Sequence, residues 1–264
     1  MSTKKTYLYY PGCTLKTKSK NFDKCGINVM KVLGVDYIEY DDWQCCGAVY
    51  PLAKDDIASR LSAVRVLEHA RNEGRYVLTM CSACHHTIKR VNKDMRENKD
   101  IRTKLNNYAQ FERPYEGETE AVHFFEMLRD DIGFETLSKL VKSPLNGRKI
   151  SAYYGCMLLR PHDALDFDNP ENPSIIEDLL RALGAKPENF SHRNECCGAY
   201  MSLDNKELTN QLCEKIFKSC KDKDVTALIT ACPLCRYNLE SNFAEEKPAV
   251  YYFTEILSES LGAS

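Results

Sequence analysis

One sequence pattern occurs twice in this chain, in the same order each time. Each copy has a Gly-Cys after an apolar run, then Cys-Cys-Gly-Ala, then a C-x2-C pair. The copies share a spacing as well, because Cys81 follows Cys46 by 35 positions and Cys232 follows Cys197 by 35 positions. Three matching motifs with one shared spacing indicate a duplicated module.

The two copies define two expected domains. The stretches AVHFFEML and AVYYFTEIL, which begin at Ala121 and Ala249, close the copies with matching sequence. The junction falls near residues 143–149. We therefore expect an N-terminal domain over residues 1–145 and a C-terminal domain over residues 146–264, each large enough for its own hydrophobic core.

Each copy has the same expected secondary structure. A strand runs into the Gly-Cys and a helix follows it; a second helix comes after the paired cysteines, and a further strand opens at the C-x2-C pair into another helix. This alternation predicts an α/β fold in which each domain has a small, largely parallel sheet with flanking helices, and in which the two domains are related by a pseudo-twofold axis. Residues 90–118 form a charged insert of the first copy, expected as a helix or surface loop. The expected elements are strands at 5–11 and 148–154, helices at about 21–34 and 174–183, a helix with Ile57, Leu61, Val64 and Leu67 on one face that ends at Gly74, its counterpart with Leu208, Leu212 and Ile216, and strands at YVLTM and ALITA.

The overall composition excludes several kinds of function. Of 264 residues 43% are apolar, and no stretch of 18 or more apolar residues could span a bilayer. A net charge of −2 gives no electrostatic case for nucleic acid or a membrane surface as partner. The first residues, MSTKKTYLYYPG, have neither the apolar core nor the cleavage site of a secretory signal, so we expect a cytoplasmic protein.

Cysteine is unusually abundant. Thirteen cysteines are many for a chain expected in a compartment that keeps thiols reduced, and their odd number and clustering favour metal or redox chemistry over a disulfide framework. Cys25, Cys213 and Cys220 lie outside the repeated pattern on apolar helix faces, where free cysteine acts as a small hydrophobic residue. The other ten belong to the repeats: Cys13, Cys45, Cys46, Cys81, Cys84, Cys156, Cys196, Cys197, Cys232 and Cys235.

The informative number is five cysteines per copy. A structural zinc ion takes four ligands, and ordinary iron–sulfur clusters use four cysteines. Adjacent residues such as Cys45 and Cys46 suit a larger object, because neighbouring side chains diverge. We therefore expect one multinuclear cluster per copy. Zinc with a spare thiol, a disulfide-exchange dithiol, and an ordinary [4Fe–4S] cluster beside one reactive cysteine are the alternatives.

The pattern C…CCG…C-x2-C resembles the cysteine-rich domain often called the CCG domain. Two copies in one chain resemble the catalytic B subunit of heterodisulfide reductase, and the specific stretches are YGCMLLRP, ECCGAYM and CPLCRYNLE, beginning at Tyr154, Glu195 and Cys232. The resemblance covers nearly the whole chain. It implies that each five-cysteine set binds a noncubane [4Fe–4S] cluster, and all ten ligand positions carry cysteine.

The resemblance also implies an oxidoreductase that acts on a disulfide. In that family the disulfide between coenzyme M and coenzyme B lies between two clusters and leaves as two thiols after two electrons and two protons. This chain has neither a ferredoxin-type cysteine run nor a G-x-G-x-x-G motif for flavin or nicotinamide, so electrons must come from partner subunits. The family implies a small ferredoxin-like iron–sulfur subunit and a flavin-containing, electron-bifurcating subunit, with hydrogenase or formate dehydrogenase as further candidates, in the setting of methanogenesis.

Four side chains beside the cysteines are candidates for other roles. His85 follows Cys84 and could protonate a leaving thiolate, with helix capping or support of the site as the alternative. Lys16, Arg160 and Arg236 could bind an anionic substrate or offset cluster charge, and solvated surface charge is the alternative.

Two further functions stay open. CCG modules also serve as electron-transfer subunits in complexes that oxidise lactate, glycolate, glycerol phosphate or succinate, or that are linked to methylene-tetrahydrofolate reductase. The last alternative is a zinc-stabilised scaffold with no redox role.

Overall fold

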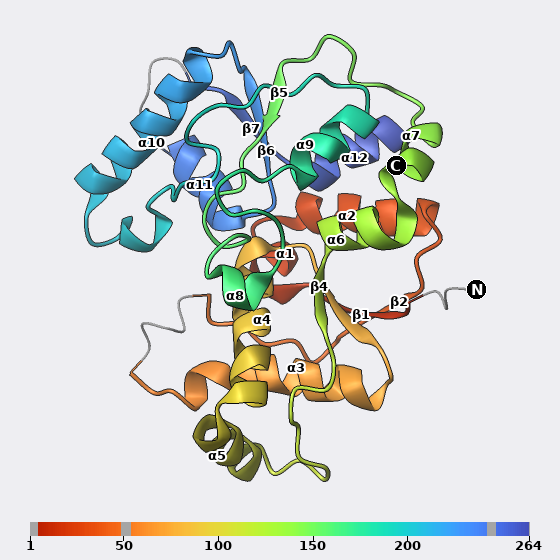
Figure 1. Cartoon of the computed structure of the whole chain (residues 1–264), viewed down its shortest axis with the longest axis vertical. Coiled ribbons are helices and arrows are strands. Elements are labelled where there is room, and N and C mark those ends of the chain that lie inside the picture. Colours follow the sequence, from red (N-terminus) through yellow and green to blue (C-terminus); the bar gives the residue numbers. More distant parts are fainter. Residues whose placement is uncertain (1–4, 49–53, 242–246, 264) are drawn as a thin grey trace.

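Two separate parallel sheets organise the chain. The structure is a computed structural model that describes residues 5–48, 54–241 and 247–263. The first sheet has four strands in the order β2-β1-β3-β4, and the second has three in the order β5-β6-β7. Figure 1 shows the two sheets in different halves of the molecule, with helices around each.

The elements of the N-terminal half contain the first sheet. They are β1 (Tyr7–Tyr10), α1 (Gly12–Lys16), α2 (Lys20–Val32), β2 (Tyr37–Glu39), η2 (Ala58–Arg60), α3 (Leu61–Asn72), β3 (Tyr76–Thr79), α4 (Ser82–Glu97), α5 (Lys99–Ala109), β4 (Ala121–His123), α6 (Phe124–Met127), the π-helical turn η3 (Leu128–Ile132) and α7 (Phe134–Lys139).

The elements of the C-terminal half contain the second sheet. They are β5 (Ile150–Ala152), α8 (His162–Leu165), α9 (Ile175–Ala182), η4 (Ala199–Met201), α10 (Lys206–Lys221), β6 (Ala227–Thr230), α11 (Pro233–Ser241), β7 (Ala249–Tyr252) and α12 (Phe253–Leu261).

Both sheets confirm the predicted α/β fold. Every strand pair is parallel, with Tyr9 opposite Leu78 in the first sheet and Ile229 opposite Tyr251 in the second. All residues of the central strands β1 and β6 are buried, as expected for parallel strands covered by helices on both faces. Among the described residues, the strand that the sequence pattern missed is β2, a three-residue edge strand with an exposed Ile38.

Most predicted helices are present. Helix α3 buries Val64 and Leu67 and ends before Gly74, whose φ of +63° is a conformation that glycine adopts without strain. Each C-x2-C pair opens a helix, α4 in the first half and α11 in the second. Of the three cysteines outside the repeats, Cys213 and Cys220 are buried in α10, whereas Cys25 in α2 is only half-buried.

Helices from opposite halves hold the two sheets together. Helix α12 packs along α2, and the two lie side by side near the centre of Figure 1. The rings of Phe22 and Tyr252 stack at 4.2 Å between centroids, and the hydroxyls of Ser19 and Tyr252 hydrogen-bond at 2.7 Å. Helices α7 and α9, also from opposite halves, are in contact as well. The division after residue 145 stays a prediction.

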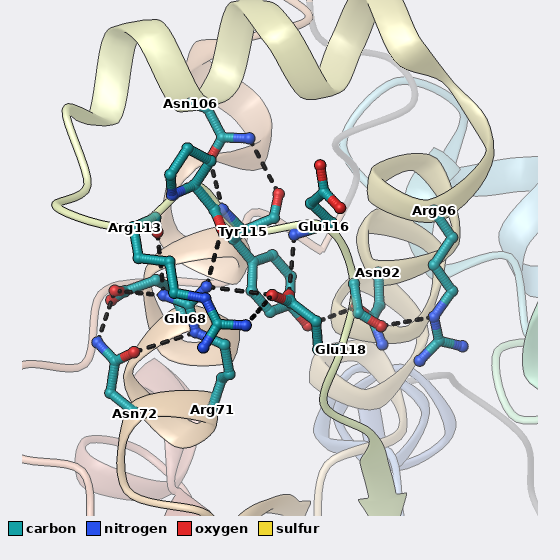
Figure 2. A network of polar contacts seen from close by, with 12 residues as sticks. Glu68, Arg71, Asn72, Asn92, Arg96, Asn106, Arg113, Tyr115, Glu116 and Glu118 are labelled. Atoms are coloured by element: carbon teal, nitrogen blue, oxygen red, sulfur yellow. Dashed lines mark hydrogen bonds and ion pairs between the residues drawn. The ribbon is translucent and has the colours of Figure 1, made fainter.

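The charged insert of the first copy is ordered by a polar network (Figure 2). The end of α4 and the whole of α5 fill much of it, and the segment after α5 returns across α3 and α4. Arg71 of α3 donates to the backbone carbonyl of Pro114 and pairs with Glu118, while the buried Tyr115 hydroxyl donates to Asn92 of α4 at 2.7 Å. These bonds give the buried Tyr115 hydroxyl and the Arg71 guanidinium polar partners.

Within the described ranges, no helix is both long enough and apolar enough to cross a bilayer.

Candidate metal centre

Strand ends bring the repeated cysteines together. Strands β1 and β3 are neighbours and run into Cys13 and Cys81; β5 and β6 are neighbours and run into Cys156 and Cys232. Because the carboxyl ends of parallel strands meet at one edge of a sheet, each sheet presents its cysteines at that edge, where ligands of α/β folds gather.

The first five cysteines form a continuous string, here called the first thiol set. The Sγ atoms of Cys13 and Cys45 lie 3.5 Å apart. Contacts continue from Cys45 to Cys46, from Cys46 to Cys84 and from Cys84 to Cys81. All five thiols therefore lie within reach of one bound object.

The other five cysteines, the second thiol set, repeat this arrangement. Cys156 contacts Cys196, and Cys196 contacts Cys197. The Sγ atoms of Cys197 and Cys235 lie 3.5 Å apart, and Cys235 contacts Cys232. The thiols contact one another in the same order as in the first set. Apart from the repeat itself, nothing in the sequence requires that order.

The second thiol set lines one cavity. About 250 Å³ of space, partly open to solvent, is surrounded by all five thiols together with Met157, Ala199, Tyr200 and Leu234. Across the described ranges, no group of three or more His, Cys, Asp or Glu side chains is arranged to hold a metal ion. A string of five thiols fits a multi-iron cluster better than a zinc ion, which takes four ligands.

One glycine in each half makes room for a thiol. Gly12 has φ of +70°, and a Cβ on it would lie 2.8 Å from the Sγ of Cys84; Gly155 has φ of +63°, and its Cβ would lie 3.1 Å from the Sγ of Cys235. Both contacts are shorter than a normal carbon–sulfur approach. A glycine is thus required before the first cysteine of each copy, because the backbone there has a positive φ and because a Cβ would lie too close to a thiol of the set.

Hydrogen bonds within the sets favour thiolates at particular positions. Bonds from Cys45 and Cys84 hold the pKa of Cys46 well below its usual range. In the second set, bonds from Cys156 and Cys197 lower the pKa of Cys196 to about 2, and the amide of Gly198 donates to its Sγ at 3.3 Å. Thiolate is the form of cysteine that binds metal.

Sequence reasoning missed one pair of tyrosines behind the thiol sets. The Tyr10 hydroxyl donates to the backbone carbonyl of Gln44, and the Tyr153 hydroxyl donates to the carbonyl of Glu195 at 2.9 Å. Gln44 and Glu195 each precede the paired cysteines of their copy, so the two bonds are equivalent. In the sequence, the matching tyrosines of LYYPGC and AYYGC could have identified this pair.

Segments that carry the two thiol sets touch across the junction of the halves. The amide of Ser82, inside the first C-x2-C pair, donates to the carbonyl of Ala231 at 2.9 Å, and Ala231 precedes the second pair. The Tyr200 hydroxyl donates to the carbonyl of Ala48 at 2.9 Å. Ala48 and Tyr200 come two and three residues after the paired cysteines of their copies, so both bonds join segments that hold thiols.

The side chains predicted to bind an anionic substrate, Lys16, Arg160 and Arg236, interact with groups of the protein itself. Lys16 pairs with Asp23 at 2.9 Å and Glu39 at 2.6 Å. Arg160 donates to the carbonyl of Asn194 at 2.8 Å. Arg236 pairs with Glu240 and Glu255 and lies 4.3 Å from the centroid of the Tyr252 ring. Their proposed contact with substrate stays a prediction, and in this structure they brace the segments around the cysteines.

His85 and Arg236 occupy the same position in the two copies. Each follows the last cysteine of its set and approaches the glutamate of a capping box: His85 Nε2 lies 3.5 Å from Glu126, and Arg236 lies 2.8 Å from Glu255. His85 is fully buried, its Nδ1 lies 3.2 Å from the Thr79 hydroxyl, and burial holds its pKa well below the usual range. Its surroundings favour the supporting role over proton donation.

Comparison with known proteins identifies the repeated pattern. The family described as the cysteine-rich domain, CCG, matches residues 7–89 and 150–240. The 8-methylmenaquinol:fumarate reductase membrane anchor subunit of Wolinella succinogenes is 28% identical over 89% of this chain and 82% of its own length. The B subunit of the ferredoxin/F(420)H(2)-dependent CoB-CoM heterodisulfide reductase of Methanosarcina acetivorans is 24% identical over 97% of this chain and 89% of its own.

A solved structure shares the fold. The crystal structure of a hypothetical protein from Helicobacter pylori superposes with a TM-score of 0.73 at 13% sequence identity. The match covers 99% of this chain but spans half the length of that protein.

Proposed function

Because this chain belongs to the cysteine-rich CCG domain family, with one copy of the domain in each half, we propose that it is the catalytic iron–sulfur subunit of a heterodisulfide reductase-type complex. Its reaction is the reduction of a disulfide, the coenzyme M–coenzyme B heterodisulfide or an analogue, to two thiols. The equation balances with two electrons from a partner subunit and two protons from water.

The observation that carries this proposal is the identical order of thiol contacts in the two halves. Five thiols follow one another in the same sequence in each set, from the Gly-Cys cysteine (Cys13, Cys156) to the first cysteine of the C-x2-C pair (Cys81, Cys232). A disulfide has two sulfur atoms, and two facing five-thiol sites supply one site for each. A zinc scaffold has no need of five thiols in either half.

Each thiol set fits one noncubane [4Fe–4S] cluster, which when bound supplies single electrons and an iron atom that can take up a thiolate sulfur. The ten repeated cysteines are the ligands. Gly12 and Gly155 leave space beside Cys84 and Cys235, and Tyr10 and Tyr153 fix the backbone before the paired cysteines. The Ser82–Ala231 bond holds the two sets at a fixed separation, across which the substrate lies.

The partners in this proposal are a ferredoxin-like iron–sulfur subunit and a flavin-containing subunit, with hydrogenase or formate dehydrogenase as further components. The similarity to the B subunit of a heterodisulfide reductase from Methanosarcina acetivorans supports them. The high number of cysteines, thirteen in an odd and clustered pattern, supports a compartment that keeps thiols reduced, which makes the cytoplasm the proposed location.

The second candidate function is an electron-transfer subunit of another oxidoreductase. The similarity to a membrane anchor subunit of a fumarate reductase supports it, because that relative serves a complex with a different substrate. In that case the thiol sets carry electrons to or from a partner enzyme and bind no disulfide.

Turnover of disulfides separates the two candidates. The chain, purified anaerobically with its partner subunits, is supplied with a reduced dye as electron donor and with the coenzyme M–coenzyme B heterodisulfide, cystine or glutathione disulfide in parallel. Release of two thiols per disulfide supports the first candidate. Dye oxidation that requires a quinone or another enzyme, with every disulfide inert, supports the second.

A further inference from the structure

Tyr200 is a polar side chain in the wall of the second thiol cavity. It lies in η4, three residues after Cys197, and its side chain is partly exposed. The described residues that line this cavity are the five cysteines, Met157, Ala199, Leu234 and Tyr200. Tyr200 therefore contributes the one side-chain oxygen or nitrogen among them.

The Tyr200 hydroxyl reaches from the second half of the chain to the first. It donates to the carbonyl of Ala48 at 2.9 Å and lies 3.7 Å from the Sδ of Met157. Burial, followed by the negative charge of Cys156, Cys232, Cys196 and Cys46, raises the pKa of Tyr200. Thiols of both sets thus lie within electrostatic range of this one hydroxyl.

Reduction of a disulfide between the thiol sets would create negative charge where this hydroxyl lies. Breaking a disulfide with two electrons leaves two sulfur atoms that carry charge until protons arrive, and a preorganised hydrogen-bond donor lowers the energy of that charge. Resting on that proposed function, we propose that Tyr200 is a catalytic residue whose hydroxyl donates a hydrogen bond to the departing substrate sulfur at the second thiol set.

The Ala48 carbonyl keeps the hydroxyl in position before substrate binds. As negative charge develops on the departing sulfur, the hydroxyl exchanges this carbonyl for that sulfur. Tyr200 keeps its own proton throughout: both electrons come from the partner subunit and both protons from water, which reaches the partly exposed side chain. The products are two thiols, so atoms and electrons balance without any change in the tyrosine.

Tyr200 has no tyrosine counterpart in the repeat. The sequence places Val49, which has no hydrogen-bonding side chain, at the corresponding position of the first copy.

The test compares Tyr200→Phe with Tyr237→Phe in the complete complex. Tyr237 is a matched control because it is 68% exposed and does not line the thiol cavity. We expect Tyr200→Phe to lower kcat and kcat/KM about tenfold or more with KM unchanged, since the lost bond acts in the transition state. Iron content and the resting EPR spectrum stay those of the wild type, while the EPR change produced by added thiol is weakened.

Two results would overturn the assignment. If Tyr200→Phe keeps the wild-type kcat and the wild-type EPR response to thiol, the hydrogen bond plays no part in the reaction. Loss of iron, or an altered resting EPR spectrum, would show that Tyr200 instead supports binding of the cluster. Failure of the proposed function is distinguishable from both, because the wild-type complex itself would then reduce no disulfide.

Discussion

The amide of Ser82 donates to the carbonyl oxygen of Ala231 at 2.9 Å, so the two C-x2-C loops of this chain touch through their backbones. Ser82 lies between Cys81 and Cys84, and Ala231 lies directly before Cys232. The bond involves backbone atoms alone. One loop from each thiol set is therefore in direct contact with the other.

The glycine before each first cysteine is predicted to be essential for metal loading. In Gly155→Ala the new methyl group lies 3.1 Å from the Sγ of Cys235, so we expect the second set to lose its cluster and the iron content to fall by about half. Gly147→Ala is the control: its φ of +77° imposes a similar backbone strain of about 1–2 kcal/mol, but nothing lies near its Cβ.

Iron analysis and thermal unfolding separate the two effects. Both variants should unfold at a lower temperature than the wild type, and Gly155→Ala alone should lose iron. Equal iron content in the two variants would show that the room beside Cys235 is irrelevant to metal binding.

The tyrosines behind the thiol sets are predicted to stabilise the paired-cysteine turns. Tyr153→Phe removes the 2.9 Å bond to the Glu195 carbonyl, which costs about 1 kcal/mol and lowers Tm by about 2–4 °C for a chain of this size. We also expect a chelator to remove iron from the second set faster. Tyr108→Phe, a change on the exposed face of α5, should alter neither property. Identical chelation rates in the two variants would contradict the role given to Tyr153.

Stability is predicted to depend on pH through Glu126. Burial raises the pKa of this carboxyl to about 6, from 4.5 in an unfolded chain. The folded state prefers the protonated carboxyl, so its contribution is complete below pH 4.5 and is lost as the pH rises through about 6. The loss amounts to about 2 kcal/mol of unfolding free energy.

Urea unfolding of the wild type and Glu126→Gln tests this expectation. Glutamine is neutral at every pH and its oxygen can still accept the amide of His123, which now donates to Glu126 at 2.6 Å. Relative to the variant, the wild type should lose about 2 kcal/mol between pH 4.5 and pH 7. Parallel stability curves would show that burial does not perturb this carboxyl.

Much of the fold could be predicted because its signals are local. The repeat and the 3.6-residue periodicity around Val64 and Leu67 predicted the helices, and apolar runs ending in cysteine predicted the strands that carry the sites. The edge strand β2 could not be predicted, because its three residues are too few to show an alternating pattern and because the strand depends on pairing with β1.

Contacts that depend on tertiary packing could not be predicted. The Tyr200–Ala48 bond joins residues 152 positions apart, and Arg236 meets Glu255 only because α11 and α12 converge. Likewise, the pairing of Lys16 with Asp23 and Glu39 depends on how α1, α2 and β2 pack. A basic residue near a cysteine motif looks the same in sequence whether it binds substrate or the protein's own carboxylates.

The central claim is that each half of the chain binds one multi-iron cluster and that this cluster contacts a substrate thiol. Anaerobic metal analysis combined with EPR of the oxidised protein tests it most directly. The account predicts about eight irons per chain, as two four-iron clusters, and an oxidised-state signal that changes when the substrate thiol is added. Zinc in place of iron, or a signal that no thiol alters, would contradict it.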